Sequence, residues 1–143
     1  MKLDLGGIGK KGSWTTVNMV QPCDILWDLD DFPYPFGDSS VHSIKMRHTF
    51  EHLKEPFRVL EELYRICKPK APIIITVPYW RDDTIGLWHK ARFKIKDFLN
   101  LDHRAKPNLT KPGKFRVVDA YYIKGRFRFW KHYSLKVVLE VVK

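Results

Sequence analysis

The sequence predicts an α/β fold: a mostly parallel β-sheet with helices packed on it and a last strand that runs antiparallel. Three observations support this prediction. The continuous apolar run 71–77 is typical of a strand at the centre of a parallel sheet, buried on both faces. It follows a helical repeat of apolar residues in 55–67. At the end of the chain, the runs 115–123 and 135–142 flank a basic loop centred on Gly125 and predict an antiparallel pair.

The remaining elements are shorter. Segments with strand character precede the helix at 2–5, 14–19, 24–29 and 41–46. The helix is delimited by Pro56, which suits a first turn, and by Pro69, which cannot continue it. Residues 81–114 are irregular and basic, with one amphipathic stretch near 94–101 that can form a second helix.

Length and composition favour a single domain over 1–143. With 143 residues, 44% of them hydrophobic and 14% aromatic, the chain can build a core and is neither disordered nor collagen-like. No stretch approaches the roughly 20 consecutive apolar residues of a membrane span, and the N-terminus lacks the apolar run of a signal peptide. Cys23 and Cys67 have neither the number nor the spacing for a disulfide framework or a zinc site. We therefore expect a cytoplasmic protein without a metal.

The net charge of +10 arises entirely from the second half of the sequence. Residues 1–80 carry ten basic and ten acidic side chains, whereas 81–143 carry sixteen basic and six acidic ones. Such an excess favours anionic partners: nucleic acid, phosphorylated metabolites or an acidic membrane surface. Lysines and arginines that only keep a small protein soluble would give the same composition.

Residues 3–9, with the sequence LDLGGIG, place clustered glycines directly after the first predicted strand. Glycines there let the backbone approach a ligand closely, although they also mark ordinary turns. Further motifs follow in order at 27–29 with 35–41, at 48–53, and at 61–69 with 73–78. This ordered set resembles the class I S-adenosylmethionine-dependent methyltransferases, in particular small type 11-like ones. The resemblance is good over 2–80 and holds only in outline over 81–143.

The resemblance implies a Rossmann-like methyltransferase sandwich and S-adenosylmethionine as cofactor. In that family the residues matching Gly6, Gly7 and Gly9 pass under the methionine part of the cofactor, and the residue matching Asp4 helps to hold its amino group. Asn18 stands where the family usually has an acid that grips both ribose hydroxyls. An amide can still bond the ribose but without charge assistance, so an acid restored at this position is expected to bind the cofactor more tightly.

By the same resemblance, Asp28 and Leu29 border the adenine, with Asp28 accepting from its exocyclic amine. The backbone around Arg47 and His48 completes the pocket. Each role has a simpler alternative, because Asp28 is also a suitable turn residue and Asp4 a suitable cap.

Two other features depart from the family pattern. Only about eight residues separate Gly6 from Trp14, too few for the usual helix after the first strand, so the resemblance implies a minimal fold in which a loop replaces it. Lys70 stands where the family has glycine after Lys-Pro, which bears on the geometry of that turn.

His48, Glu51 and His52 also spell H-x-x-E-H, an inverted zinc-protease pattern. The pattern requires one helix through both histidines, and this segment follows a predicted strand. The simpler interpretation is that Glu51 and His52 orient the turn between that strand and the next helix.

Substrate-side candidates lie in the second half. His89 is a candidate general base or acceptor-orienting residue, or a plain surface histidine. The basic aromatic tract 126–133 suits either stacking on bases or an ordinary strand.

Three functions remain open: methyl transfer to an unidentified, anionic acceptor such as a small molecule or RNA; a cofactor-binding module without turnover; and a basic nucleic-acid-binding protein. The sequence does not predict the oligomeric state.

Overall fold

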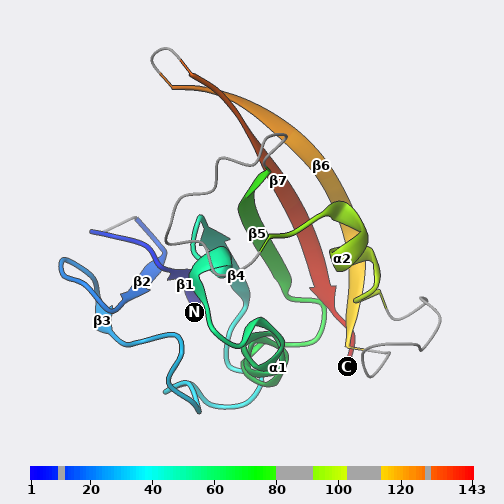
Figure 1. Ribbon diagram of the computed structural model, residues 1–143. Helices are drawn as coiled ribbons and strands as arrows, with labels where there is room; N and C mark the ends of the chain where they lie inside the picture. Colours follow the sequence, from blue (N-terminus) through cyan, green and yellow to red (C-terminus); the bar gives the residue numbers. More distant parts are fainter. Residues whose placement is uncertain (10–11, 80–91, 103–113, 128–129) are drawn as a thin grey trace.

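The computed structural model describes residues 1–9, 12–79, 92–102, 114–127 and 130–143. Its seven strands form one sheet in the order β3-β2-β1-β4-β5-β7-β6 (Figure 1). The strands are β1 (Lys2–Leu5), β2 (Thr15–Asn18), β3 (Ile25–Leu26), β4 (Ser43–Arg47), β5 (Pro72–Tyr79), β6 (Phe115–Phe127) and β7 (Trp130–Val141). Strands β1 to β5 pair in parallel, whereas β7 pairs antiparallel with both β5 and β6. The predicted fold class, a mostly parallel sheet closed by an antiparallel strand, is confirmed.

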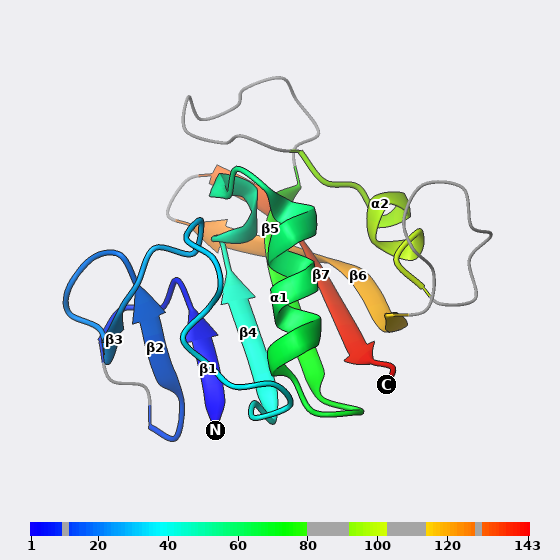
Figure 2. The ribbon, with the colours of Figure 1, turned by 90° about the horizontal axis from the view of Figure 1, so that it is seen from below.

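The helical elements lie on one face of this sheet (Figure 2). They are the 3₁₀ turn η1 (Phe50–His52), α1 (Pro56–Ile66) and α2 (Ile95–Leu99). Helix α1 buries Val59, Leu60, Leu63 and Ile66 in the core. In the described part of the chain, no helix covers the opposite face. None of these helices has the length and apolarity needed to span a membrane.

Strand β5 shows the consequence of this one-sided packing. Ile73, Ile75 and Val77 point to the helical face and are fully buried, whereas Ile74 and Thr76 point to the other face and stay partly exposed. The prediction that 71–77 is buried on both faces is therefore wrong for one face. An apolar run alone cannot tell whether a second layer of helices exists.

The closing hairpin is longer than predicted. Gly125 does not lie in a loop but pairs with His132 inside the β6–β7 ladder, which continues to Phe127 and Trp130. Tyr122 and Ile123 before Gly125 and Phe127 after it favour extended backbone, and they override the single glycine as a turn signal. By contrast, β3 has two residues, fewer than the predicted 24–29.

Helix α1 ends at Ile66, and the next residue, Cys67, is buried as a free thiol. Burial raises the pKa of this thiol to about 12. The last carbonyl groups of the helix are satisfied by Lys143, whose Nζ donates to the carbonyl oxygens of Arg65 (3.0 Å) and Cys67 (2.6 Å). The chain then reaches β5 through Lys70, which has a left-handed φ of 62°.

Between β1 and β2, residues 6–9 and 12–14 contain no helix. The expected loop in place of the helix after the first strand is therefore present in the described residues.

Candidate functional site

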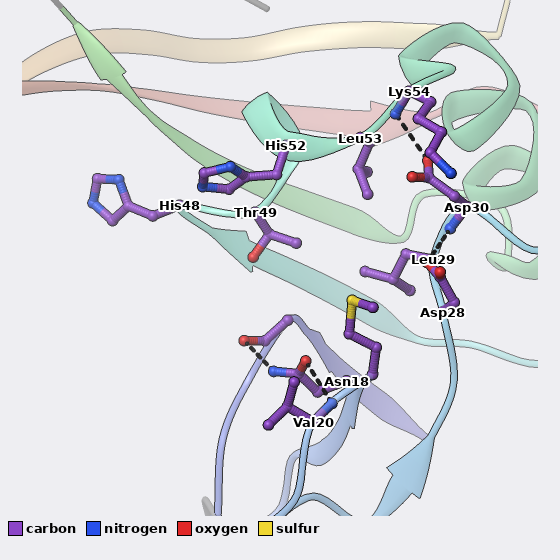
Figure 3. A pocket seen from close by; sticks show the side chains of 12 residues that line it. Asn18, Val20, Asp28, Leu29, Asp30, His48, Thr49, His52, Leu53 and Lys54 are labelled. Atoms are coloured by element: carbon purple, nitrogen blue, oxygen red, sulfur yellow. Dashed lines mark hydrogen bonds between the residues drawn. The ribbon is translucent and has the colours of Figure 1, made fainter. Parts of the chain in front are cut away.

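A cavity of about 510 Å³ opens at the carboxyl ends of the first four strands (Figure 3). Twelve residues line it: Gly6, Asn18, Met19, Val20, Asp28, Leu29, Asp30, His48, Thr49, His52, Leu53 and Lys54. These residues come from four segments, which lie at or just after the carboxyl ends of β1, β2, β3 and β4. Because β1 lies between β2 and β4, this edge is the point where the strand order reverses, the usual ligand site of open α/β sheets.

Gly6, the first residue of the glycine segment 6–9, lines the cavity next to the end of β1. Gly6 has a φ of +79°, and its N–H donates to the carbonyl oxygen of Val17 (2.7 Å). A Cβ at Gly6 would collide with the side chain of Thr49, and one at Gly7 would collide with Asp4. Both glycines are therefore required for packing.

Asn18 ties β2 to this glycine segment. Its Nδ2 donates to the carbonyl oxygens of Gly6 (3.1 Å) and Gly7 (3.3 Å), and its Oδ1 accepts from the N–H of Val20 (3.2 Å). Two acceptors on one side and a donor on the other fix the orientation of the amide. The amide hydrogens of Asn18 are thus engaged within the protein.

At the other end of the cavity, the turn after β3 carries two acids. Asp28 Oδ1 accepts from the N–H of Asp30 (2.9 Å), and Asp30 Oδ1 accepts from the N–H of Lys54 (2.8 Å) (Figure 3). The second oxygen of Asp28 makes no hydrogen bond within the described residues. Asp28 therefore holds its turn and still presents an acceptor to the cavity.

Behind β1, Asp4 is only 3% exposed, and its Oδ2 lies 3.2 Å from Lys45 Nζ. Asp4 does not line the cavity. This carboxylate is neutralised by the lysine on the adjacent strand β4.

The exit of β4 brings two histidines around one buried carboxylate. Glu51 is 2% exposed, and neither of its oxygens has a hydrogen-bond partner. Its Oε1 lies 3.7 Å from His48 Nδ1 and 3.8 Å from His52 Nε2. His48 has a left-handed φ of 51°, so it ends the strand and cannot share a helix with His52, which belongs to η1. The zinc-protease interpretation therefore fails, and no group of three metal-ligating side chains occurs within the described ranges.

Residues 17–75 match the protein family described as methyltransferase domain. The match covers less than half of the chain. It agrees with the resemblance noted in the sequence, which implies S-adenosylmethionine as cofactor. No curated protein sequence matches the chain significantly.

Solved structures share the methyltransferase fold over 99% of this chain. An S-adenosylmethionine-dependent methyltransferase from Aquifex aeolicus has 19% identity and a TM-score of 0.65, and 81% of that chain is covered. A chain of the Haloferax volcanii complex between the Trm112 methyltransferase activator and a methyltransferase has 18% identity and a TM-score of 0.64, again with 81% covered. The 1,6-didemethyltoxoflavin-N1-methyltransferase of Burkholderia thailandensis, whose structure holds S-adenosylhomocysteine, has 16% identity and a TM-score of 0.67, with 71% covered. At these identities the likeness shows the fold.

Five of the nine residues expected at the cofactor line the cavity: Gly6, Asn18, Asp28, Leu29 and His48. Four do not line it: Asp4, Gly7, Gly9 and Arg47. His89 and the whole basic aromatic tract 126–133 lie outside the residues whose side chains the structure describes.

Several lining residues of the cavity were not expected from the sequence, chiefly Met19, Val20, Thr49, Leu53 and Lys54. Each one is next to, or within, a motif that was recognised. Their position in the sequence could have identified them, because residues that directly follow parallel strands gather at the same edge of the sheet.

Proposed function

We propose that this chain transfers a methyl group from S-adenosylmethionine to an acceptor that enters at the carboxyl edge of the sheet. One observation carries the proposal: a cavity of about 510 Å³ at that edge joins the Gly6 backbone to the acceptor oxygen of Asp28. Its volume falls within the roughly 300–1,000 Å³ of small-molecule sites. The residues present fit an elongated ligand with an amine-bearing base at one end.

In this proposal the backbone of Gly6, Gly7 and Gly9 supports the methionine part of the cofactor. Asp28 and Leu29 border the adenine, and the backbone at Arg47 and His48 closes the pocket. The sulfonium of the cofactor supplies an activated methyl group, so the protein mainly has to align the acceptor with it.

The acceptor is proposed to be anionic, because residues 81–143 hold the whole net charge of +10. Strands β6 and β7 belong to this basic half and extend the sheet beyond β5. A basic rim raises the local concentration of an anion and speeds its encounter, in a way that salt weakens. A cytoplasmic location belongs to the same proposal, since the free thiols Cys23 and Cys67 suit a reducing compartment.

The first test is calorimetric titration with S-adenosylhomocysteine. The wild type should bind, and Asp28→Asn should bind about tenfold more weakly, because the amide keeps the oxygen that holds the turn but turns a donor toward the adenine amine. Asp31→Asn, an equal change on an exposed residue that does not line the cavity, should bind like the wild type. Absence of binding by a folded wild type would refute the proposal.

The second test is a methyl-transfer screen over neutral and anionic acceptors at low and high salt. Anionic acceptors should be preferred, with a KM that rises with salt. A neutral acceptor used equally well at both salt levels would contradict the anionic assignment only.

A cofactor-binding module without turnover is the second candidate. Asn18 favours it, because its amide hydrogens are engaged with Gly6 and Gly7. Such a module would bind S-adenosylhomocysteine and methylate nothing in the screen.

A further inference from the structure

We propose that His48 accepts a proton from the methyl acceptor and that Glu51 positions it, so that the acceptor is a hydroxyl or N–H group that loses a proton on methylation. This inference rests on the proposed function. It assigns a role to the His-x-x-Glu-His motif that cofactor binding leaves unused.

The first support is the state of Glu51. A carboxylate that is 2% exposed, with no hydrogen bond to either oxygen, is costly to bury. The groups that approach it are the imidazoles of His48 and His52, at 3.7 and 3.8 Å from the same Oε1. A positive charge on one imidazole would offset the cost of the buried anion. Contacts of this kind are often long without substrate and shorten when it binds.

The second support is which nitrogen each ring turns to the carboxylate. His48 presents Nδ1 to Glu51, which leaves Nε2 without a partner in the described part of the chain. His52 presents Nε2 instead. A hydrogen bond to a carboxylate fixes the proton on the nitrogen that donates it, so once this 3.7 Å contact shortens, His48 would carry its proton on Nδ1 and keep a lone pair on Nε2. This lone pair is the proton acceptor.

The third support is the backbone of His48. A φ of 51° in a residue with a side chain is strained, and such strain persists only where the surrounding structure imposes it. Here the N–H of His48 is held by the carbonyl oxygen of Thr76 on β5 (2.8 Å). This conformation places the ring beside the cavity.

Figure 3 shows the two histidines at the end of the cavity opposite Asp28 and Leu29. The other ionisable groups that line the cavity, Asp28, Asp30 and Lys54, lie at the far end, and among the described residues Glu51 is the charged side chain that approaches His48. The two histidines therefore supply the ionisable side chains at this end of the cavity, where we place the acceptor.

The step is balanced as follows. The acceptor oxygen or nitrogen forms a bond to the methyl carbon, and the carbon–sulfur bond breaks, leaving its electron pair on sulfur. The proton of the acceptor passes to Nε2 of His48. The resulting imidazolium is stabilised by the carboxylate of Glu51.

The first experiment needs neither cofactor nor acceptor. Long-range ¹⁵N–¹H NMR of the histidine rings should show His48 protonated on Nδ1 and His52 on Nε2. In Glu51→Gln, His48 should lose this preference. His42 is the control: its Nδ1 lies 2.9 Å from the N-terminal amine and should not respond to the change at Glu51. Protonation of wild-type His48 on Nε2, or an unchanged His48 tautomer in Glu51→Gln, would overturn the proposal.

The second experiment uses an acceptor found in the screen. His48→Asn, which tolerates the left-handed backbone, should lower kcat at least about 100-fold and regain activity with added imidazole. Its affinity for S-adenosylhomocysteine and its KM should stay within about threefold, or ~0.7 kcal/mol. His42→Asn should retain wild-type kcat. An unchanged kcat in His48→Asn would overturn this proposal, whereas loss of cofactor binding by the wild type would overturn the proposed function.

Discussion

At the scale of single residues, Lys70 occupies a backbone conformation that suits glycine better. It lies in the turn between α1 and β5 with a φ of 62°, at the position where related methyltransferases have glycine. A left-handed conformation costs a residue with a Cβ roughly 1–2 kcal/mol. The side chain is exposed and its loss removes no core contact.

Lys70→Gly should therefore raise the free energy of unfolding by about 1 kcal/mol, part of the relief being offset by the greater freedom of glycine in the unfolded chain. Urea unfolding measures this change. Lys68→Gly is the control, because Lys68 has no positive φ and the same substitution there should destabilise. A loss of stability in Lys70→Gly would contradict the strain argument.

Asn18 reverses an expectation drawn from the sequence. An acid at this position was expected to grip the ribose more tightly, but the amide donates to Gly6 and Gly7. A carboxylate in Asn18→Asp would face two carbonyl oxygens, lose both hydrogen bonds and release the glycine segment. Affinity for S-adenosylhomocysteine should fall about tenfold, or ~1.4 kcal/mol.

Calorimetry tests this, with Gln21→Glu as control, because it makes the same charge change three residues away and keeps the oxygen that accepts from Cys23. Tighter binding by Asn18→Asp would show that the side chain serves the ribose instead.

At the scale of elements, Arg65 joins α1 to the segment before β4. Its guanidinium donates to Glu62, to Asp38 and to the carbonyl oxygens of Tyr34 and Phe36. Glu62 in turn accepts from the N–H of Tyr34 (2.8 Å). The hydrogen bond from Arg65 contributes most to lowering the pKa of Glu62 below its ordinary value.

A lowered pKa in the folded state contributes stability that is present above the unfolded pKa and lost as the pH falls through the folded one. Glu62→Gln should therefore lower stability at pH 7 by roughly 1–2 kcal/mol and weaken its decline below about pH 4.3. Unfolding midpoints between pH 7 and 3 measure both. Glu61→Gln is the control, since Glu61 is 62% exposed beside Lys114, and it should change neither quantity. Equal acid sensitivity of Glu62→Gln and the wild type would contradict the linkage.

The elements differ in how far their sequences predict them. Helix α1 and strand β5 were predicted within a few residues, because periodicity and prolines are local signals. The ends of β3 and the position of the turn in the closing hairpin were not predicted, because they depend on pairing with a neighbouring strand. The same holds at the site: the motif order predicted that Gly6 and Asp28 would meet, whereas the partners of Asn18 required the fold.

At the scale of the whole molecule, the described helices cover one face of the sheet. Two isoleucines on opposite faces of β5 therefore contribute unequally to the free energy of unfolding. Ile75 is fully buried, and Ile75→Ala should cost about 2–5 kcal/mol. Ile74→Ala, its neighbour on the other face, should cost roughly 1 kcal/mol, in proportion to its partial burial. Chemical denaturation of both variants tests this. Equal costs would show that the second face is covered in solution.

The rate at which the buried thiol at the end of α1 reacts can measure how often this helix opens away from the sheet. Thiolates are the reactive form of cysteine, and with a pKa of about 12 only about one Cys67 in ten thousand is ionised at pH 8. A maleimide or disulfide reagent can therefore modify Cys67 only when α1 separates from the sheet. The rate of this modification, read by mass spectrometry beside that of the more accessible Cys23, measures how often the helix that follows the histidine pair detaches. If S-adenosylhomocysteine binds where we propose, it should slow the modification of Cys67, because Leu53 and Lys54, which line the cavity, lie just before α1.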